Sequence, residues 1–328
     1  MASHRIFSGI QPSGEVHIGN YLGAIKNWVK LQHEYESIYC IVDYHAITVE
    51  YEPADLRRRV RELAATLIAA GIDTERSILF VQSAVPEHTE LGWLFTCITP
   101  LGLLERMTQF KEKAARHEQA SVSAGLLCYP ILQAADILLY KADLVPVGED
   151  QIQHIEFTRD IGRKFNHLFG ETFPEAQALV TKTARVMALT DPTSKMSKSI
   201  PGGAVPLAAE PDEIRRLVRR AVTDTGPVSS GEMSPGVKNL FVLLESFGTP
   251  EDVARFQQDY EAGRLRYVDL KDAVAEAMIK ELTPIRERRN ALLEDPERLD
   301  AVLAQGAERA RAIARATIGE VKERMGFR

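Results

Sequence analysis

The sequence predicts an α/β fold: a doubly wound, Rossmann-like parallel sheet followed by an all-helical domain. Two observations indicate this fold. Up to about residue 200, short runs rich in β-branched and aromatic residues alternate with helical patterns. After Pro206 only amphipathic helical patterns remain. We therefore expect a first domain over 1–206, with a helical insertion near 103–142, and a helical domain over 207–328 whose last helix packs back on the first.

The elements follow from local patterns in chain order. Strands are predicted at 5–10, 37–46, 77–83 and 144–148, where apolar runs are bounded by turn residues. The first helix is predicted from Pro12 to Val29, and the next ends at Gly71. Further helices are expected near 88–98, 103–116, 125–141, 151–166, 211–224, 236–247, 250–263, 270–293 and over about the last 25 residues.

Composition limits the classes of function. With 328 residues and a net charge of −6, the chain can bury a large core, but its surface cannot be basic throughout. Nucleic acid would have to be bound by local basic patches. No signal peptide and no membrane-length apolar run is visible, so we expect a soluble, cytoplasmic protein without a membrane partner. Cys40, Cys97 and Cys128 lack metal-ligand or redox spacing and are expected to be buried thiols.

The stretch PSGEVHIGN follows the first strand and places polar residues at a helix start. His17 and Asn20 are three residues apart, so they share one face of the first turn, and both side chains can donate hydrogen bonds. Free N–H groups at a helix start suit a phosphate. Alone, this spacing is equally compatible with a histidine that merely caps the helix.

A second stretch, TDPTSKMSKSIPGG, places Lys195 and Lys198 in a loop flanked by proline and glycine. Two lysines three residues apart on such a loop suit a charge that develops during a reaction, for example on pyrophosphate leaving ATP. A solvated basic loop is the plainer interpretation of this stretch if it is considered alone.

Together, HIGN and KMSKS resemble the paired signatures of the class I aminoacyl-tRNA synthetases, with Asn20 where the family usually has a second histidine. The likeness covers essentially the whole chain and is greatest to the bacterial tryptophanyl enzymes, in IFSGIQPSG, YPILQAADILLY and VPVGEDQIQH. The first domain would then be catalytic, and the helical domain would bind the tRNA anticodon.

The resemblance implies a division of roles. Catalysis would rest on Lys195, Lys198, Lys113, His17 and Asn20. The other residues at ATP would be Gln11, Pro12, Ser13, Gly19, Gly148, Glu149, Asp150, Val186, Met187, Met196, Ser197 and Ser199. The tryptophan pocket would contain Asp136, Phe7, His45, Tyr129, Gln133, Val147 and Gln151. Mg²⁺ would be carried on the phosphates, since no carboxylate cage for a protein-held metal is visible.

Tyrosine is the main alternative substrate. An indole has one N–H donor and no acceptor, which suits the carboxylate of Asp136. Gln133 is typical of tyrosyl enzymes, whereas Phe7 lacks the hydroxyl that those enzymes commonly place on this strand to read a phenol. The balance favours tryptophan.

The resemblance also implies partners: tRNA(Trp), which the basic clusters at 215–220 and 285–290 would contact, and a second copy in a homodimer. Two other classes stay open. One is a tRNA-independent paralogue that makes or holds tryptophanyl-adenylate. The other is a small-molecule nucleotidyltransferase, whose helix start is similar but whose chain is usually shorter.

Overall fold

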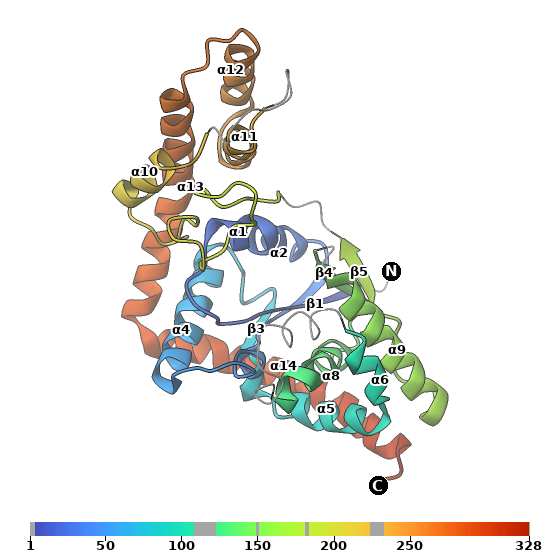
Figure 1. Cartoon of the computed structure of the whole chain (residues 1–328). Helices are drawn as coiled ribbons and strands as arrows, with labels where there is room; N and C mark the ends of the chain where they lie inside the picture. Colours follow the sequence, from blue (N-terminus) through green and yellow to red (C-terminus); the bar gives the residue numbers. More distant parts are fainter. Residues whose placement is uncertain (1–3, 108–122, 149–150, 181–183, 224–232, 328) are drawn as a thin grey trace.

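A computed structural model describes residues 4–107, 123–148, 151–180, 184–223 and 233–327. Its centre is a five-stranded, wholly parallel sheet in the order β3-β2-β1-β4-β5 (Figure 1). The strands are β1 (Arg5–Ile10), β2 (Glu36–Ile41), β3 (Ile78–Val81), β4 (Leu144–Val147) and β5 (Gln177–Val180). The predicted doubly wound sheet is confirmed, and β5 is a fifth strand beyond the four that the sequence predicts.

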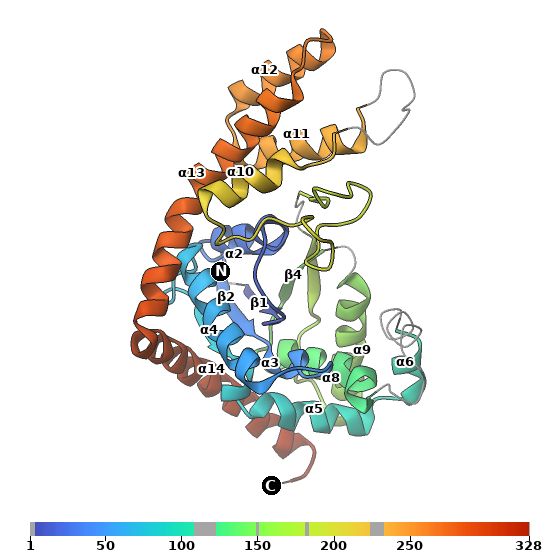
Figure 2. The ribbon, with the colours of Figure 1, turned by 60° about the vertical axis from the view of Figure 1, so that its left-hand side comes forward.

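The strand order reverses between β1 and β4. The chain runs outward through β2 and β3, then returns to lay β4 on the other side of β1. In open parallel sheets, ligands bind outside the carboxyl ends of the strands at such a reversal. The loop after β1 and Gly148, which follows β4, therefore border the expected binding position (Figure 2).

Side chains that alternate along the strands pack into two apolar cores, one on each face of the sheet. Ile6, Tyr39 and Leu79 face one layer, while Phe7, Cys40 and Phe80 face the other. The first layer includes α2 (Lys26–Leu31), α4 (Pro53–Ala69) and α13 (Tyr267–Glu294). The second includes α5 (Glu87–Ile98), α8 (Ala124–Leu138), α9 (Ile152–Phe169) and much of α14 (Pro296–Arg324). Helices thus cover both faces of the sheet.

The predicted first helix begins later than expected. Residues 12–16 form no helix; α1 (Ile18–Asn20) starts after His17 and continues as a π-helix (Tyr21–Ile25) into α2. Gly14 has φ +127°, a conformation that breaks a helix and that other residues rarely adopt. The predicted strand 37–46 is likewise too long: it ends at Ile41, and α3 (Asp43–Ala46) forms a turn of helix.

The predicted helices of the second half are confirmed as α10 (Pro211–Arg219), α11 (Pro235–Phe247), α12 (Pro250–Glu261), α13 and α14. Ser234, Thr249 and Asp295 cap three of them by accepting a backbone N–H. Of the predicted helix 103–116, the structure describes α6 (Leu101–Glu105), and residues 108–116 lie outside the described part. The division at residue 206 stays a prediction.

One cysteine prediction is wrong. Cys40 is buried in β2 as expected and Cys128 is half-buried, but Cys97 is exposed on α5. Its apolar neighbours in sequence, Leu94 and Phe95, turn toward the core, so the helical period carries Cys97 to the outer face.

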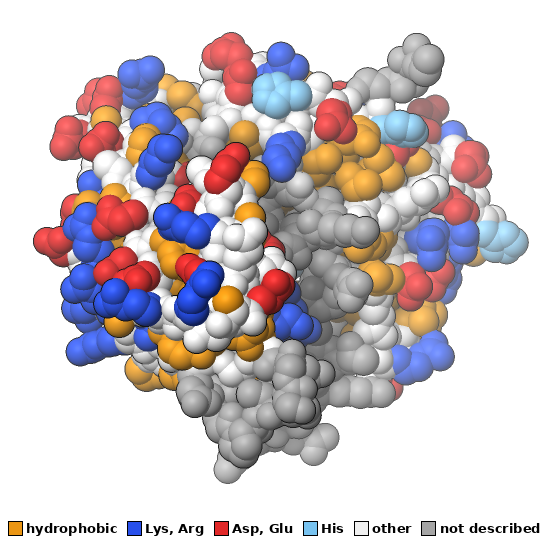
Figure 3. Space-filling view, turned by 90° about the horizontal axis from the view of Figure 1, so that it is seen from above, with side chains coloured by type: hydrophobic (Ala, Val, Ile, Leu, Met, Phe, Trp, Pro, Cys, Tyr) orange, Lys and Arg blue, Asp and Glu red, His pale blue; other side chains and the backbone are white. Residues whose placement is uncertain are grey.

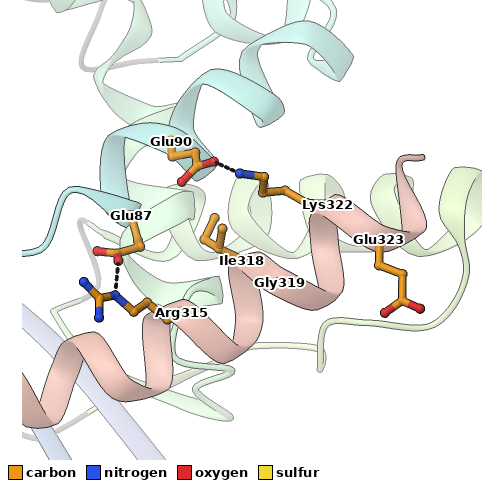
Figure 4. A pocket seen from close by; sticks show the side chains of 7 residues that line it. All are labelled: Glu87, Glu90, Arg315, Ile318, Gly319, Lys322 and Glu323. Atoms are coloured by element: carbon orange, nitrogen blue, oxygen red, sulfur yellow. Dashed lines mark hydrogen bonds and ion pairs between the residues drawn. The ribbon is translucent and has the colours of Figure 1, made fainter. Parts of the chain in front are cut away.

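The last helix is held against the first domain by ion pairs and by one close backbone approach. Lys322 Nζ lies 2.8 Å from Glu90, and Arg315 Nε lies 3.2 Å from Glu87, on either side of a cavity of about 400 Å³ (Figure 4). Gly306 lies against β3, where a Cβ would come 1.9 Å from the carbonyl oxygen of Leu79. A glycine is needed there for α14 to reach the sheet.

Replacing Gly306 by alanine is therefore expected to destabilise the fold. The added methyl group must push α14 or β3 aside, which costs typically about 1–3 kcal/mol. Gly319→Ala on the same helix is the matched control, because nothing lies within 4 Å of its Cβ position. Alanine should stabilise that position by up to about 1 kcal/mol. Urea unfolding measures both, and wild-type stability of Gly306→Ala would contradict this close packing.

Candidate active site

The start of α1 holds two side chains in a reciprocal cap. His17 Nδ1 accepts a hydrogen bond from the Gly19 N–H at 3.1 Å, while the backbone N–H of His17 donates to Asn20 Oδ1 at 3.2 Å. Both acceptor atoms are thus occupied by local backbone. The groups left to bind a ligand are donors: the His17 Nε2–H and the Asn20 amide N–H groups.

His17 is neutral near pH 7. Its side chain is buried. Its pKa is lowered to about 4, mainly because burial disfavours the charged ring and also because the positive charges of Lys198 and Lys195 are near. A neutral ring whose Nδ1 accepts must carry its proton on Nε2. The prediction that His17 can donate a hydrogen bond is compatible with this geometry, and the donor is a neutral imidazole.

The lysine loop is a small β-hairpin. The Ala188 N–H donates to the Ser194 carbonyl at 2.9 Å, and the Met196 N–H donates to the Val186 carbonyl at 3.0 Å. Asp191 closes the tip by accepting from the Ser194 hydroxyl at 2.6 Å. The hairpin carries Lys195 on its returning arm, directly opposite Met187.

Backbone hydrogen bonds join the segment that follows the lysine hairpin to the start of α1. Ile18 N–H donates to the Val205 carbonyl at 3.0 Å, and Leu207 N–H donates to the Val16 carbonyl at 2.8 Å. Lys198 crosses the turn before the helix, where a Cβ on Gly14 would lie 3.1 Å from its Nζ atom. The two predicted stretches, remote in sequence, therefore meet beyond the carboxyl end of β1.

Asp136 forms the centre of a buried polar network that sequence reasoning described only in part. It is 1% exposed, and its carboxylate contacts His45 Nε2 at 2.8 Å, Gln82 Nε2 at 2.7 Å and His88 Nδ1 at 2.6 Å. Burial alone would raise the pKa of Asp136, but the hydrogen bonds from the two histidines hold it well below its usual range. The carboxylate is therefore charged.

The network continues to Tyr140, whose hydroxyl lies 2.7 Å from His88 Nε2. If His88 donates from Nδ1 to Asp136, its Nε2 accepts from that hydroxyl, so the one O–H donor of Tyr140 is already used. Phe7 stacks on Tyr140, with ring centroids 5.4 Å apart. Two carboxylate oxygens offer about four acceptor positions, of which three are filled, so Asp136 can accept one further N–H.

Of the other predicted pocket residues, Tyr129 has a contact with this network. Tyr129 contacts His45 edge-on at 6.3 Å and forms a 2.9 Å hydrogen bond with His154. The remaining positions are Gln133 on α8 one turn before Asp136, Val147 at the end of β4 and Gln151 at the start of α9.

The predicted ATP residues divide into described and undescribed positions. The loop after β1 contains Gln11, Pro12 and Ser13, and Gly148 follows β4. Val186 and Met196 are buried in the hairpin, and the Ser197 and Ser199 hydroxyls lie 2.9 Å apart. Lys113, Glu149 and Asp150 lie outside the described residues.

The basic clusters are engaged within the protein. Arg288 donates to the Ala69 carbonyl at 2.7 Å and Arg289 donates to the Thr66 hydroxyl at 3.1 Å, which fastens α13 to α4. Arg215 pairs with Glu276 at 2.7 Å. Figure 3 shows basic and acidic side chains interspersed on the upper face of the molecule.

Three residues of this region were missed by sequence reasoning. Gln82 and His88 bind Asp136, and Asn239 of α11 binds the backbone of Met187. Asn239 follows Val237 and precedes Leu240 and Phe241 on an otherwise apolar helix face. A polar residue on a core-facing stripe was the available signal.

The described residues show neither a metal-binding cluster nor a membrane-spanning helix. Among the described residues, no group of three or more His, Cys, Asp or Glu side chains is arranged to hold a metal ion. None of the described helices combines the length and apolar character needed to span a membrane.

Comparison with known proteins places this geometry in a family. The model of the class I tRNA synthetases (W and Y) matches residues 2–283. Tryptophan–tRNA ligases of Clostridium tetani and Clostridium acetobutylicum are 50% and 48% identical, each over 98% of this chain and 95% or 96% of their own. The crystal structure of tryptophanyl-tRNA synthetase from Campylobacter jejuni complexed with ADP and tryptophan has a TM-score of 0.87 and 36% identity, covering 98% of this chain and 99% of that one. The chain therefore belongs to the class I tRNA synthetases, and within them to the tryptophan–tRNA ligases.

Proposed function

We propose that the protein is a tryptophan–tRNA ligase, which activates L-tryptophan with ATP to tryptophanyl-adenylate and pyrophosphate, then transfers tryptophan to the 3′ end of tRNA(Trp). The observation that carries this proposal is the meeting of the α1 start with the lysine hairpin over the carboxyl end of β1. The names of the relatives, and the ADP and tryptophan in the Campylobacter structure, support it.

Activation needs positioning and charge stabilisation more than proton transfer. The tryptophan carboxylate attacks the α-phosphorus of ATP, a new O–P bond forms, and the bond to the β-phosphate oxygen breaks as pyrophosphate leaves. Lys195 and Lys198 balance the charge that develops on the phosphates, and His17 and Asn20 donate hydrogen bonds to them. Lys113 joins them, and Mg²⁺ arrives on the phosphates.

The Asp136 network fits an indole better than a phenol. An indole donates one N–H, and Asp136 can accept one more. A phenol is read best by a paired donor and acceptor, but the nearby Tyr140 hydroxyl is bound to His88, and Phe7 has no hydroxyl. His45 and Val147 would wall the ring, and Tyr129 and Gln151 would hold the α-ammonium group.

In the transfer step, the helical half of the chain would bind tRNA. Because Arg288 and Arg289 fasten α13 to α4, we propose that tRNA is contacted by other basic side chains of the two clusters, for example Arg220, which follows α10. We propose a symmetric homodimer acting in the cytoplasm, where tRNA is charged.

Pyrophosphate exchange tests the proposed function directly. The purified protein should exchange labelled pyrophosphate into ATP strongly with tryptophan and weakly with every other common amino acid, because the carboxylate of Asp136 selects a lone N–H donor. Attachment of tryptophan to tRNA(Trp) is measured alongside. Equal exchange with tyrosine would overturn the substrate, and exchange without charging would point to a tRNA-independent paralogue.

Replacing Lys195 by alanine should lower the rate of adenylate formation by roughly 10²–10³, with a much smaller effect on ATP binding. The reason is that an interaction made chiefly in the transition state reduces turnover, whereas lost ground-state binding raises the Michaelis constant. Single-turnover adenylate formation over a range of ATP concentrations separates the two effects.

The matched control is Lys30→Ala, which removes an exposed lysine from α2 and should leave the rate unchanged. A Lys195→Ala enzyme with a normal maximal rate and only a raised ATP requirement would show that Lys195 is a ground-state anchor.

A further inference from the structure

Asn239 makes a two-point contact with one residue of the lysine hairpin. Its Oδ1 accepts from the Met187 N–H at 2.9 Å, and its Nδ2 donates to the Met187 carbonyl at 3.0 Å. The side chain is only 4% exposed. Since one amide group satisfies both a backbone donor and a backbone acceptor, the contact sets the position and the orientation of that stretch of backbone.

The polar groups of Met187 point away from the hairpin partner. The two cross-strand hydrogen bonds come from the neighbours, through Ala188 N–H and the Val186 carbonyl, while Met187 and Lys195 form the antiparallel pair between them. Asn239 therefore takes the place that a third strand would occupy. Through Met187 it fixes the arm that faces Lys195.

The segment before α11 also contacts the base of the lysine hairpin. The Val222 N–H donates to the Leu189 carbonyl at 2.8 Å, next to the hairpin arm. Gly236, at the start of α11, is so close to Val222 that a Cβ would lie 2.0 Å from the Val222 carbonyl oxygen. The helical half is thus tied to the base of the hairpin at two points, and Asn239 is the side chain that reaches it.

We propose that Asn239 is a positioning residue for tryptophan activation: it couples α11 of the helical half to Lys195 by holding the Met187 arm of the hairpin. The inference rests on the proposed function and adds a residue that does not itself touch substrate. Because Asn239 acts through the hairpin, its loss should impair adenylate formation only while Lys195 is present.

A double-mutant cycle tests this dependence. Asn239→Leu keeps the approximate volume but removes both hydrogen bonds, and we expect roughly a 10-fold loss of kcat/KM in ATP-dependent exchange, the scale of one or two hydrogen bonds. On the Lys195→Ala background the same change should cost less than about twofold, since the effects of residues coupled through one stretch of backbone do not add. Equal losses on both backgrounds would overturn the proposal.

Loop order gives a readout that is independent of activity. Trypsin should cut after Lys195 and Lys198 faster in folded Asn239→Leu than in the wild type, as followed by mass spectrometry. Ser246→Ala is the matched control, because Ser246 lies two turns further along α11 and its hydroxyl bonds only within that helix, to the Val242 carbonyl at 2.7 Å. Unchanged cleavage in Asn239→Leu would contradict the proposed restraint.

A third variant guards against a folding defect. In Asn239→Asp the ionised carboxylate faces the Met187 carbonyl, whereas a protonated carboxyl can both donate and accept as the amide does. Its exchange rate relative to wild type should therefore recover as the pH falls through the pKa of the introduced carboxyl group. A ratio that stays flat through that pKa would count against the two-point contact.

The outcomes separate this inference from the proposed function. If the wild type fails to exchange with tryptophan, the function is wrong. If it exchanges but Lys195→Ala is as active as wild type, the coupling to Lys195 is overturned while the function stands. If both behave as proposed and the cycle is additive, the role of Asn239 alone is wrong.

Discussion

The pair of backbone hydrogen bonds between residues 16–18 and residues 205–207 is the constraint on which the candidate site depends. Without it, the start of α1 would present its donors at the edge of the sheet, and the lysine hairpin would have no fixed relation to them. With it, Lys198 lies over Gly14, and Met196 packs next to Gly19. The relative position of Lys198 and the start of α1 follows from this junction.

The charges at this junction are arranged to suit a polyanion. His17 is kept neutral by burial and by the two lysines, so it adds a hydrogen-bond donor without adding a cation that would repel them. The lysines therefore carry the positive charge, on a hairpin whose far side is held by Asn239. Around Asp136, the hydrogen bonds from His45 and His88 keep the carboxylate charged, and together with Gln82 they leave it one acceptor position. The proposed function uses the junction for phosphate and Asp136 for a single N–H.

Local patterns predicted the parts of this arrangement that depend on neighbours in sequence. Helical spacing placed Asp136 in the right helix, and the proline and glycine that flank KMSKS placed Lys195 in a loop between the sheet and the helices. The start of α1 was misplaced because proline and glycine suggested a helix start, whereas the left-handed turn at Gly14 delays it. Gln82, His88 and Asn239 were missed because their roles depend on contacts between distant segments, and no periodicity reports a hydrogen-bond partner.

The most direct test of this account is the protonation state of His17, measured by two-bond ¹H–¹⁵N correlation NMR of the imidazole nitrogens across pH, with His17→Gln used to assign the signals. The account predicts a neutral ring at pH 7 with the proton on Nε2 and a titration midpoint at about pH 4. A midpoint near the ordinary 6.5, or a proton on Nδ1, would contradict it, because the cap at the start of α1 would then differ from the one that sets the donors of the site.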